Sequence, residues 1–352
     1  MDSATALPDD FVRLLPSAAL LAYRIDPAAD AIELVKVERG FYRQAPFLDQ
    51  RAFAGLRLDG FRGRLSEVAA LLPVATPPLR FIFHIGHCGS TLVSRSLDGL
   101  PGVLGLREPL PLLSLVAAAE ALDSPLSPGS GAKFDALIGT VRKLLARGFA
   151  PLDLPVVKAT SVVSVLAERL LGASDRAVFL SLPLPTYLAA LLRDPGLRAA
   201  ARLTARPRWA DYRGRGGDAG RRLQALSDAE CIALTWLIDS DRAERLATAA
   251  DRRGHVLRLD FEFWLRAPAA AMARVAQTLA LPHTDESIAS ALQQAEPGRY
   301  AKDRQQLFDA DTRRRELDQA SRQFAAEIDQ GRRFVESVLS RQPGRFLVAL
   351  ER

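Results

Sequence analysis

The sequence predicts an α/β protein, a three-layer sandwich with a central parallel sheet, preceded by an N-terminal α+β segment. From Phe81 onward, short apolar runs typical of buried strands alternate with longer stretches of helical periodicity, and a glycine-containing turn follows the first run. Alternation of this kind is typical of βαβ units, which build parallel sheets. The 352 residues suffice for one large domain with an added segment, or for two small domains.

Composition is that of an ordinary globular protein. Hydrophobic residues make up 48% of the chain and charged residues 25%, which argues against extensive disorder. The net charge of +6 suits polyanionic small molecules or acidic substrates and does not by itself imply nucleic acid. Cys88 and Cys231 form no C-x-x-C pair, so neither a disulfide framework nor a cysteine-rich zinc site is expected, and a reducing compartment fits.

The first residues and the apolar stretches bear on location. Residues 1–10 contain three aspartates and no basic region followed by an apolar core, so no secretory signal is expected. No span reaches the ~20 apolar residues that a membrane helix needs. We therefore expect a soluble, cytoplasmic protein without a membrane partner.

The N-terminal segment is predicted to comprise residues 1–78. Apolar runs at residues 18–23 and 31–37 flank a turn-rich stretch with Asp26, Pro27 and Asp30, which predicts a hairpin over residues 17–38. The segment from there to Leu72 is expected to be helical. The breaker-rich residues 73–78 mark the boundary with a second domain, residues 79–352.

The second domain supplies the predicted sheet. Strands are expected at residues 81–85, 103–106, 155–158, 177–182 and 255–259. Helices are expected at residues 92–100, 161–171, 227–250 and 268–279. The third of these helices opens with Ser227-Asp-Ala-Glu230, which has the spacing of a capping box.

Two charged stretches complete the pattern. Residues 202–222 carry seven arginines, two aspartates and four glycines, which predicts a long mobile loop. Such a loop could order around an anionic or polyhydroxylated substrate, so we expect it to act as an acceptor lid. Residues 311–342 are predicted as a charged amphipathic helical stretch that is interrupted near Gly331.

The turn after the first predicted strand carries the candidate chemistry. It reads Gly86-His-Cys-Gly-Ser-Thr91, between a buried strand and a helix. Gly86 and Gly89 allow backbone conformations closed to other residues, and the helix N-terminus offers free amides and a positive dipole end to an anion. Ser90 and Thr91 add hydroxyl donors. The alternative is a helix start with an incidental pair of glycines.

Two other anion-binding loops share parts of this pattern. A Walker A loop requires a lysine directly before Ser90, and this chain has none, which disfavours an ordinary ATPase or GTPase. A cysteine phosphatase of the pattern H-C-x5-R would require arginine at Ser94. Arg95 comes one residue late, about a quarter of a helical turn away. Cys88 is therefore expected to be a small loop residue and not a nucleophile.

A metal site is a further possible interpretation of this loop. His84 and His87 lie near each other in sequence, but no Asp or Glu falls at ligand spacing nearby. We therefore expect no metal, and we expect His84 to be a core histidine.

The loop and several later motifs resemble one known family. Residues 81–92, F-I-F-H-I-G-H-C-G-S-T-L, resemble the donor loop of sulfotransferases, particularly of bacterial members whose loop reads C-G-S-T-L. L-R-E-P at 106–109 resembles the second strand, which ends in glutamate, and P-V-V-K-A-T at 155–160 resembles the third, which ends in lysine. L-D-F-E at 259–262 and R-Y-A-K at 299–302 resemble the L-x-Y-E stretch and the basic segment that closes over the nucleotide. The resemblance covers roughly residues 81–334.

The resemblance implies a P-loop NTPase-like fold and a reaction. The chain would transfer a sulfuryl group from 3′-phosphoadenosine 5′-phosphosulfate to a hydroxyl or amine of a small molecule, glycan or peptide. Glu108 would be the general base, and Lys158 and His87 would act at the donor phosphates. The donor-binding residues would be Gly86, His87, Cys88, Gly89, Ser90, Thr91, Leu92, Arg299, Tyr300 and Lys302.

Each of these roles has a structural alternative. Glu108 could instead pair with Arg107 or cap a helix, and Lys158 could be a solvated surface lysine. The segment around Tyr300 could be an exposed basic loop. No nucleic-acid partner is expected.

The chain departs from the family at two positions. His87 stands where most members have a basic residue, and Leu182 stands where an arginine usually holds the 3′-phosphate. Two other functions therefore stay open: a catalytically silent nucleotide-binding scaffold, and a small-molecule kinase with an atypical phosphate loop.

Overall fold

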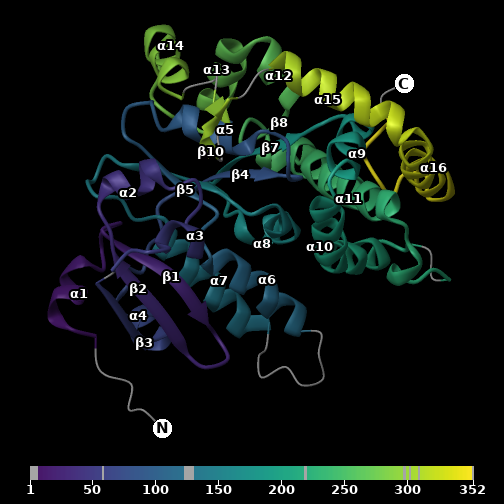
Figure 1. The fold of residues 1–352 in the computed structure, drawn as a ribbon. Coiled ribbons are helices and arrows are strands. Elements are labelled where there is room, and N and C mark those ends of the chain that lie inside the picture. The colour runs from purple at the N-terminus through teal and green to yellow at the C-terminus, as the bar shows by residue number, and fades with distance from the viewer. Residues whose placement is uncertain are drawn as a thin grey trace.

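A computed structural model describes residues 7–57, 59–122, 131–217, 220–295, 299–300, 303–307 and 310–350. Within these ranges the centre of the molecule is a parallel sheet in the order β5-β6-β4-β7-β8 (Figure 1). Its strands are β4 (Arg80–His84), β5 (Val103–Arg107), β6 (Leu154–Lys158), β7 (Arg176–Ser181) and β8 (Val256–Asp260). The predicted α/β class and all five predicted strands are confirmed, within two residues at each end.

The order of the strands indicates where on the sheet a ligand site is expected. β4 lies in the middle, β6 and β5 follow on one side, and β7 and β8 follow on the other. The chain therefore changes direction across the sheet at β4, and open α/β sheets bind ligands at the carboxyl ends of strands beside such a point. β5 and β4 are consecutive in sequence, but β6 lies between them. The Lys158 end of β6 thus separates the loop after β4 from Glu108 after β5.

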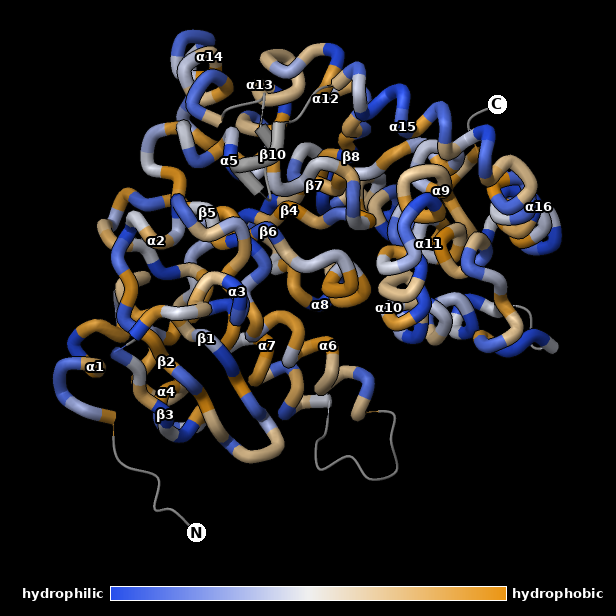
Figure 2. The backbone as a smooth tube through the Cα atoms, in the orientation of Figure 1, coloured by the Kyte–Doolittle hydropathy of each residue, from blue (hydrophilic) through white to orange (hydrophobic). Residues whose placement is uncertain are grey.

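Alternate side chains of the sheet enter two hydrophobic cores, one on each face. In β4, Ile82 belongs to one core, whereas Phe81 and Phe83 belong to the other. Phe83 stacks on Phe81 and on Phe179 of β7, with ring centroids 5.3 and 4.9 Å apart. Figure 2 shows hydrophobic residues along the central strands and α8, whereas α15 at the surface is largely hydrophilic.

Helices cover both faces, which gives the three layers. The core on the first face includes residues of α5 (Ser90–Leu97), α9 (Leu184–Leu192), α11 (Asp228–Thr248), α12 (Phe261–Arg266), α13 (Pro268–Thr278), α14 (Asp285–Gln294) and α16 (Ala325–Arg341). The core on the second face includes residues of α6 (Pro111–Leu122), α7 (Gly131–Leu145), the 3-10 helix η1 (Ser161–Leu166) and α8 (Ala167–Leu170). The predicted capping box is present, because Ser227 accepts from the Glu230 amide at 3.2 Å and Glu230 accepts from the Ser227 amide at 2.9 Å.

The N-terminal segment forms a small antiparallel sheet. Its elements are α1 (Asp9–Leu14), β1 (Leu20–Asp26), β2 (Ala31–Lys36), α2 (Arg39–Gln44), α3 (Gln50–Phe53), β3 (Gly60–Arg64) and α4 (Leu65–Leu71). The predicted hairpin is confirmed as β1 and β2. The prediction of helix as far as Leu72 is wrong at β3, which pairs with β2. Its sequence G-F-R-G-R has little strand propensity, so the pairing is decided by contact with β2.

The arginine-rich segment is not a loop over most of its length. Helix α10 (Pro195–Gly214) begins at Asp194, whose carboxylate accepts from the amides of Gly196 and Leu197 at 2.7 and 3.2 Å. The prediction of a mobile loop over residues 202–222 is therefore wrong. A high content of arginine does not prevent packing here, because Arg208 is fully buried beside Asp239.

The C-terminal helical stretch is present, but its break lies elsewhere. α15 (Ala310–Gln323) and α16 meet at Phe324, and Gly331 lies inside α16. A Cβ at Gly331 would come within 2.9 Å of Leu188 Cδ2, so this glycine allows close helix packing and does not end a helix. The remaining elements are η2 (Leu223–Ala225), η3 (Ala250–Arg252), β9 (Arg299–Tyr300) and β10 (Asp303–Leu307). In the described ranges, no helix is both long and apolar enough to cross a membrane.

Candidate functional site

The loop between β4 and α5 has the backbone of an anion cradle. Gly86 and Gly89 adopt φ values of +90° and +70°, as their predicted role requires. His87 adopts a φ of +53°, which is uncommon for a residue with a side chain. A strained residue of this kind persists only where its surroundings enforce it, and such residues gather at functional sites.

Unpaired donors gather where this loop enters α5. Within the described residues, no acceptor is found for the amides of Gly89, Ser90, Thr91 and Leu92. The Thr91 hydroxyl is also buried there and has no partner among the described residues. Because a buried donor without a partner costs about 1–3 kcal/mol, these groups fit an anion that would accept their hydrogen bonds.

The two glycines of the loop leave room for different neighbours. A Cβ at Gly86 would meet the Ser161 side chain at 3.6 Å, which is an ordinary contact. A Cβ at Gly89 would come within 2.0 Å of the Phe261 ring. The missing side chain of Gly89 therefore admits Phe261, the first residue of α12, so a substitution there would disturb packing as well as the loop.

Cys88 and His84 hold the loop from beneath. Cys88 is fully buried, its thiol donates to the Leu180 carbonyl at 3.5 Å, and burial raises the pKa of the thiol to about 12. A thiol that stays protonated is not a nucleophile, as expected for a small loop residue. His84 is buried, and its Nδ1 accepts from the Gly86 amide at 3.0 Å, which confirms its prediction as a core histidine.

Glu108 pairs with Lys158 at the carboxyl edge of the sheet. The Lys158 ammonium donates to Glu108 Oε1, and the Glu108 amide donates to the Lys158 carbonyl at 2.6 Å. The Lys158 side chain is 1% exposed and that of Glu108 is 16% exposed. Lys158 is thus not a solvated surface lysine. The suggested pairing of Glu108 with Arg107 does not form, because Arg107 turns to Asp98.

Glu108 lines one cleft, with a volume of about 290 Å³, together with the first residues of the loop between β4 and α5. His87, which is exposed, lines the same cleft, so two of the predicted catalytic side chains are brought together there. Glu108 has a φ of +54°, a second left-handed residue with a side chain in this cleft. The rest of its lining comprises Phe47, Arg51, His84, Ile85, Gly86, Thr160, Ser161, Tyr187, Leu191, Leu197, Ala200, Ala201, Thr204 and Thr235.

Many of these lining residues were not found by sequence reasoning. Tyr187 donates to the Ile85 carbonyl at 2.6 Å and fixes the start of the phosphate loop. Burial raises the pKa of its phenol well above the ordinary value, so it stays protonated and serves as a brace. Nothing in the sequence around Tyr187 distinguishes it from a core tyrosine. Its contact with Ile85 arises only in the folded chain.

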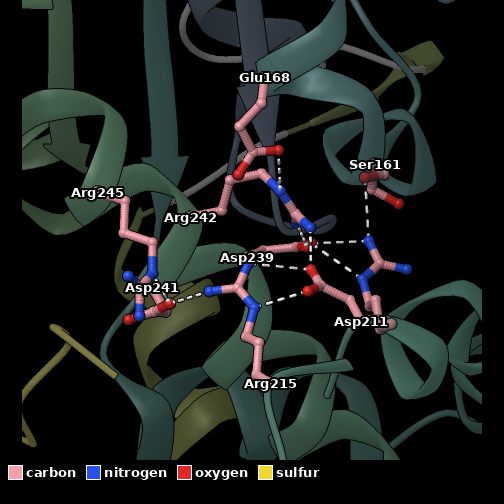
Figure 3. A network of polar contacts seen from close by, with 9 residues as sticks. Ser161, Glu168, Asp211, Arg215, Asp239, Asp241, Arg242 and Arg245 are labelled. Carbon is pink, nitrogen blue, oxygen red and sulfur yellow. Dashed lines mark hydrogen bonds and ion pairs between the residues drawn. The ribbon is translucent and has the colours of Figure 1, made fainter. Parts of the chain in front are cut away.

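A buried ion network supports the far wall of the cleft. Two nitrogens of the Arg208 guanidinium donate to Asp239 Oδ2, at 2.7 and 3.0 Å, and the group also donates to the Ser161 and Thr204 carbonyls at 3.0 and 2.9 Å. Ser161 and Thr204 line the cleft, so the Arg208 guanidinium joins η1 to α10 at this wall. Figure 3 shows how the network continues across α10 and α11. Its other members are Glu168, Asp211, Arg215, Asp241, Arg242 and Arg245.

The structure gives little information on the other residues that were predicted to bind the donor nucleotide. The backbone of Arg299 and Tyr300 forms β9, which pairs antiparallel with β10. Their side chains and the whole of Lys302 lie outside the described residues. Leu182 is buried in the core, and its carbonyl accepts from the Trp236 indole at 2.8 Å.

The fold of the chain is similar to those of several solved structures. A sulfotransferase domain from the curacin biosynthetic pathway is 13% identical over 71% of this chain and 99% of that chain, with a TM-score of 0.41. A sulfotransferase domain from the Synechococcus PCC 7002 olefin synthase is 15% identical over 72% and 97%, with a TM-score of 0.41. A sulfotransferase from Mycobacterium avium is 15% identical over 73% and 78%, with a TM-score of 0.38. Likeness at this level concerns the fold alone. No protein-family model and no curated protein matches the chain.

Proposed function

We propose that the chain transfers a sulfuryl group from 3′-phosphoadenosine 5′-phosphosulfate to a hydroxyl or amine of an acceptor. One observation carries the proposal: Glu108 lines the same cleft as Gly86 and His87, the first residues of the loop between β4 and α5, at the carboxyl edge of the parallel sheet. A carboxylate there can take a proton from an acceptor, while the loop holds the anionic donor.

The loop would bind the donor's leaving phosphate. The amides of residues 89–92 and the Thr91 hydroxyl lack acceptors among the described residues, and they lie at the positive end of α5. Sulfuryl transfer, like phosphoryl transfer, needs an in-line arrangement and stabilisation of the charge that develops on the leaving oxygen. Hydrogen bonds that are already in position supply that stabilisation without reorganisation.

Glu108 would act as the general base. Its carboxylate would accept the acceptor's proton as the acceptor oxygen or nitrogen attacks sulfur. Lys158 fixes the carboxylate through its ammonium and fixes the backbone through its carbonyl. We further propose that Lys158 and His87 approach the donor phosphates, and that Arg299, Tyr300 and Lys302 contact the nucleotide.

A silent nucleotide-binding scaffold is the second candidate. It is favoured by the buried Leu182, which offers no charge to a 3′-phosphate at the position where the family has arginine. Calorimetric titration separates the candidates. The desulfonated nucleotide 3′-phosphoadenosine 5′-phosphate should bind a sulfotransferase, ATP with magnesium should bind a kinase, and a scaffold should bind nucleotide without turnover.

Glu108→Gln tests the proposed base, because it keeps the size of the side chain and removes its basicity. The rate of transfer of labelled sulfate to a panel of alcohols and amines should fall about 10²- to 10⁴-fold, with nucleotide affinity nearly unchanged. Glu286→Gln, an exposed change on α14, is the matched control and should keep the parental rate. Parental turnover in Glu108→Gln would exclude Glu108 as the base and make His87 the next candidate.

A further inference from the structure

Phe47 is a buried aromatic residue that neither hydrophobic core uses. It is 6% exposed, yet it belongs to neither cluster of core residues and lines the cleft instead. The Arg51 guanidinium lies 4.0 Å from the centroid of its ring, and the Lys158 ammonium lies 5.5 Å from it. Both distances are within the range of a cation–π contact. Through this ring the N-terminal segment therefore contacts Lys158 of the Glu108–Lys158 pair.

The backbone around Phe47 is fixed to the strand that ends at Glu108. The Leu48 amide donates to the Arg107 carbonyl at 2.7 Å. The Arg107 guanidinium is fully buried and donates to the Tyr42 carbonyl and, at 3.0 Å, to that of Ala45. Arg107 directly precedes Glu108, so residues 42–48 are anchored within one residue of the proposed base.

A second anchor comes from the helix of the phosphate loop. Arg95 of α5 donates to the Gln44 carbonyl at 3.3 Å. Figure 1 shows α2 and α3 beside β5, between the N-terminal sheet and the central one. The stretch that carries Phe47 is therefore held by α5 on the donor side and by β5 on the side of the base.

The charged and apolar residues that line the cleft near Phe47 indicate which parts of an acceptor they would contact. Hydrogen bonds to Asp49 raise the pKa of Arg51, and the charge of Glu108 acts in the same direction, so Arg51 is a cation at the mouth of the cleft. Leu191, Leu197 and Ala200 make another part of the lining apolar. An acceptor between these groups and the Phe47 ring would place apolar atoms next to the hydroxyl or amine that is presented to Glu108.

We infer that Phe47 completes the active cleft from the N-terminal segment: it contacts an apolar part of the acceptor and covers the Glu108–Lys158 pair. The inference rests on the proposed function for the acceptor. The covering of Lys158 can be tested without any acceptor. If Phe47 contacts the acceptor in this way, the N-terminal residues 1–78 take part in selecting the substrate.

The covering is tested by acetylating the folded full-length chain with N-hydroxysuccinimidyl acetate and quantifying Lys158 by peptide mass spectrometry. Lys158 should be protected in the parent and acetylated at least about tenfold faster in Phe47→Ala, while the exposed Lys133 reacts equally in both. Phe61→Ala removes a ring that packs on Phe11 in the same segment, and it is the matched control. Equal protection of Lys158 in the parent and in Phe47→Ala overturns the covering.

Acceptor contact is tested with the best acceptor from the sulfate-transfer panel. Phe47→Ala should raise the KM for the acceptor about tenfold or more, Phe47→Leu should raise it less, and neither should change the affinity for 3′-phosphoadenosine 5′-phosphate. An active parent with an unchanged acceptor KM in both variants overturns the contact alone. A parent that binds no nucleotide and transfers no sulfate overturns the proposed function, while the acetylation result still decides whether Phe47 covers Lys158. Melting curves accompany each variant, and Phe47→Leu serves if Phe47→Ala does not fold.

Discussion

Thr91 shows how a single residue can favour binding over folding. Its hydroxyl is buried without a partner among the described residues, which costs free energy in the folded state unless an anion accepts its hydrogen bond. A hydrogen bond to a charged partner contributes about 1.5–3 kcal/mol. If the loop binds an anion as proposed, the same hydroxyl is unfavourable without the anion and favourable with it.

Thr91→Val should consequently change stability and affinity in opposite directions. The variant replaces the hydroxyl by a methyl group of similar size, so its melting temperature without nucleotide should be equal to or higher than that of the parent. Its affinity for 3′-phosphoadenosine 5′-phosphate should fall roughly tenfold or more, in line with one lost charge-assisted hydrogen bond. Thermal unfolding and calorimetric titration measure the two effects. Unchanged affinity would remove Thr91 from the anion site.

Both cysteines should resist alkylation in the folded protein. Burial raises the pKa of Cys88 to about 12 and that of Cys231 to about 11, so neither forms thiolate near neutral pH. An ordinary thiol becomes more reactive as pH rises from 7 to 9, because its thiolate fraction grows. Iodoacetamide labelling of the folded protein should therefore be much slower than that of an ordinary exposed thiol over that range, and both cysteines should label in denaturant. Rapid labelling of Cys88 in the folded chain would contradict its burial.

Among the helices, α10 was the least accessible to sequence reasoning. Seven arginines and four glycines in residues 202–222 indicate a solvated loop when each residue is judged alone. The folded chain provides buried carboxylates on α11 for two of them. Asp239 pairs with Arg208 of α10, and Asp241 pairs with Arg215 at the end of that helix, a pair that Figure 3 shows. Paired and hydrogen-bonded in this way, an arginine can be buried.

The Arg208–Asp239 pair gives a quantitative test of that account. Arg208→Met alone should destabilise the fold by about 3–5 kcal/mol, because it leaves a buried carboxylate with too few donors. Adding Asp239→Leu should recover most of the loss, since apolar side chains of similar volume can replace a buried pair. Denaturant unfolding measures both variants.

An exposed pair on α16 is the control. Arg332 and Glu336 lie 3.5 Å apart, and their side chains are 54% and 47% exposed. Arg332→Met should therefore cost no more than about 0.5 kcal/mol. An equal cost for Arg208→Met and Arg332→Met would show that burial does not set the energy of the α10 pair.

Taken as a whole, the molecule places the N-terminal segment and one face of the central sheet in a single hydrophobic core. Ile32 and Leu34 of β2 belong to the same cluster as Phe81 and Phe83 of β4. Residues 79–352 alone would expose the part of that core that the N-terminal segment covers. We expect this fragment to precipitate, or to melt at least about 10 °C below the full chain, which itself should unfold in one transition. A soluble fragment with the parental melting temperature would make residues 1–78 an independent unit.

The sequence by itself determined the parts of this protein that depend on neighbouring residues. The five central strands, the capping box at Ser227 and the left-handed glycines of the phosphate loop follow from hydrophobic periodicity and local backbone chemistry. Glu108 and His87, which the family resemblance singled out, both line the cleft, because both follow parallel strands whose carboxyl ends meet at one edge of a sheet.

Only the tertiary structure decided the contacts between residues that are distant in the chain. It inserted β6 between β4 and β5, so that Lys158 pairs with Glu108, and it added β3 to the N-terminal sheet. It also brought Phe47 and Tyr187 to the cleft and buried Arg208. The physical reason is common to all of these: each side chain takes its role from a partner supplied by packing, and no pattern within a short window of sequence specifies that partner.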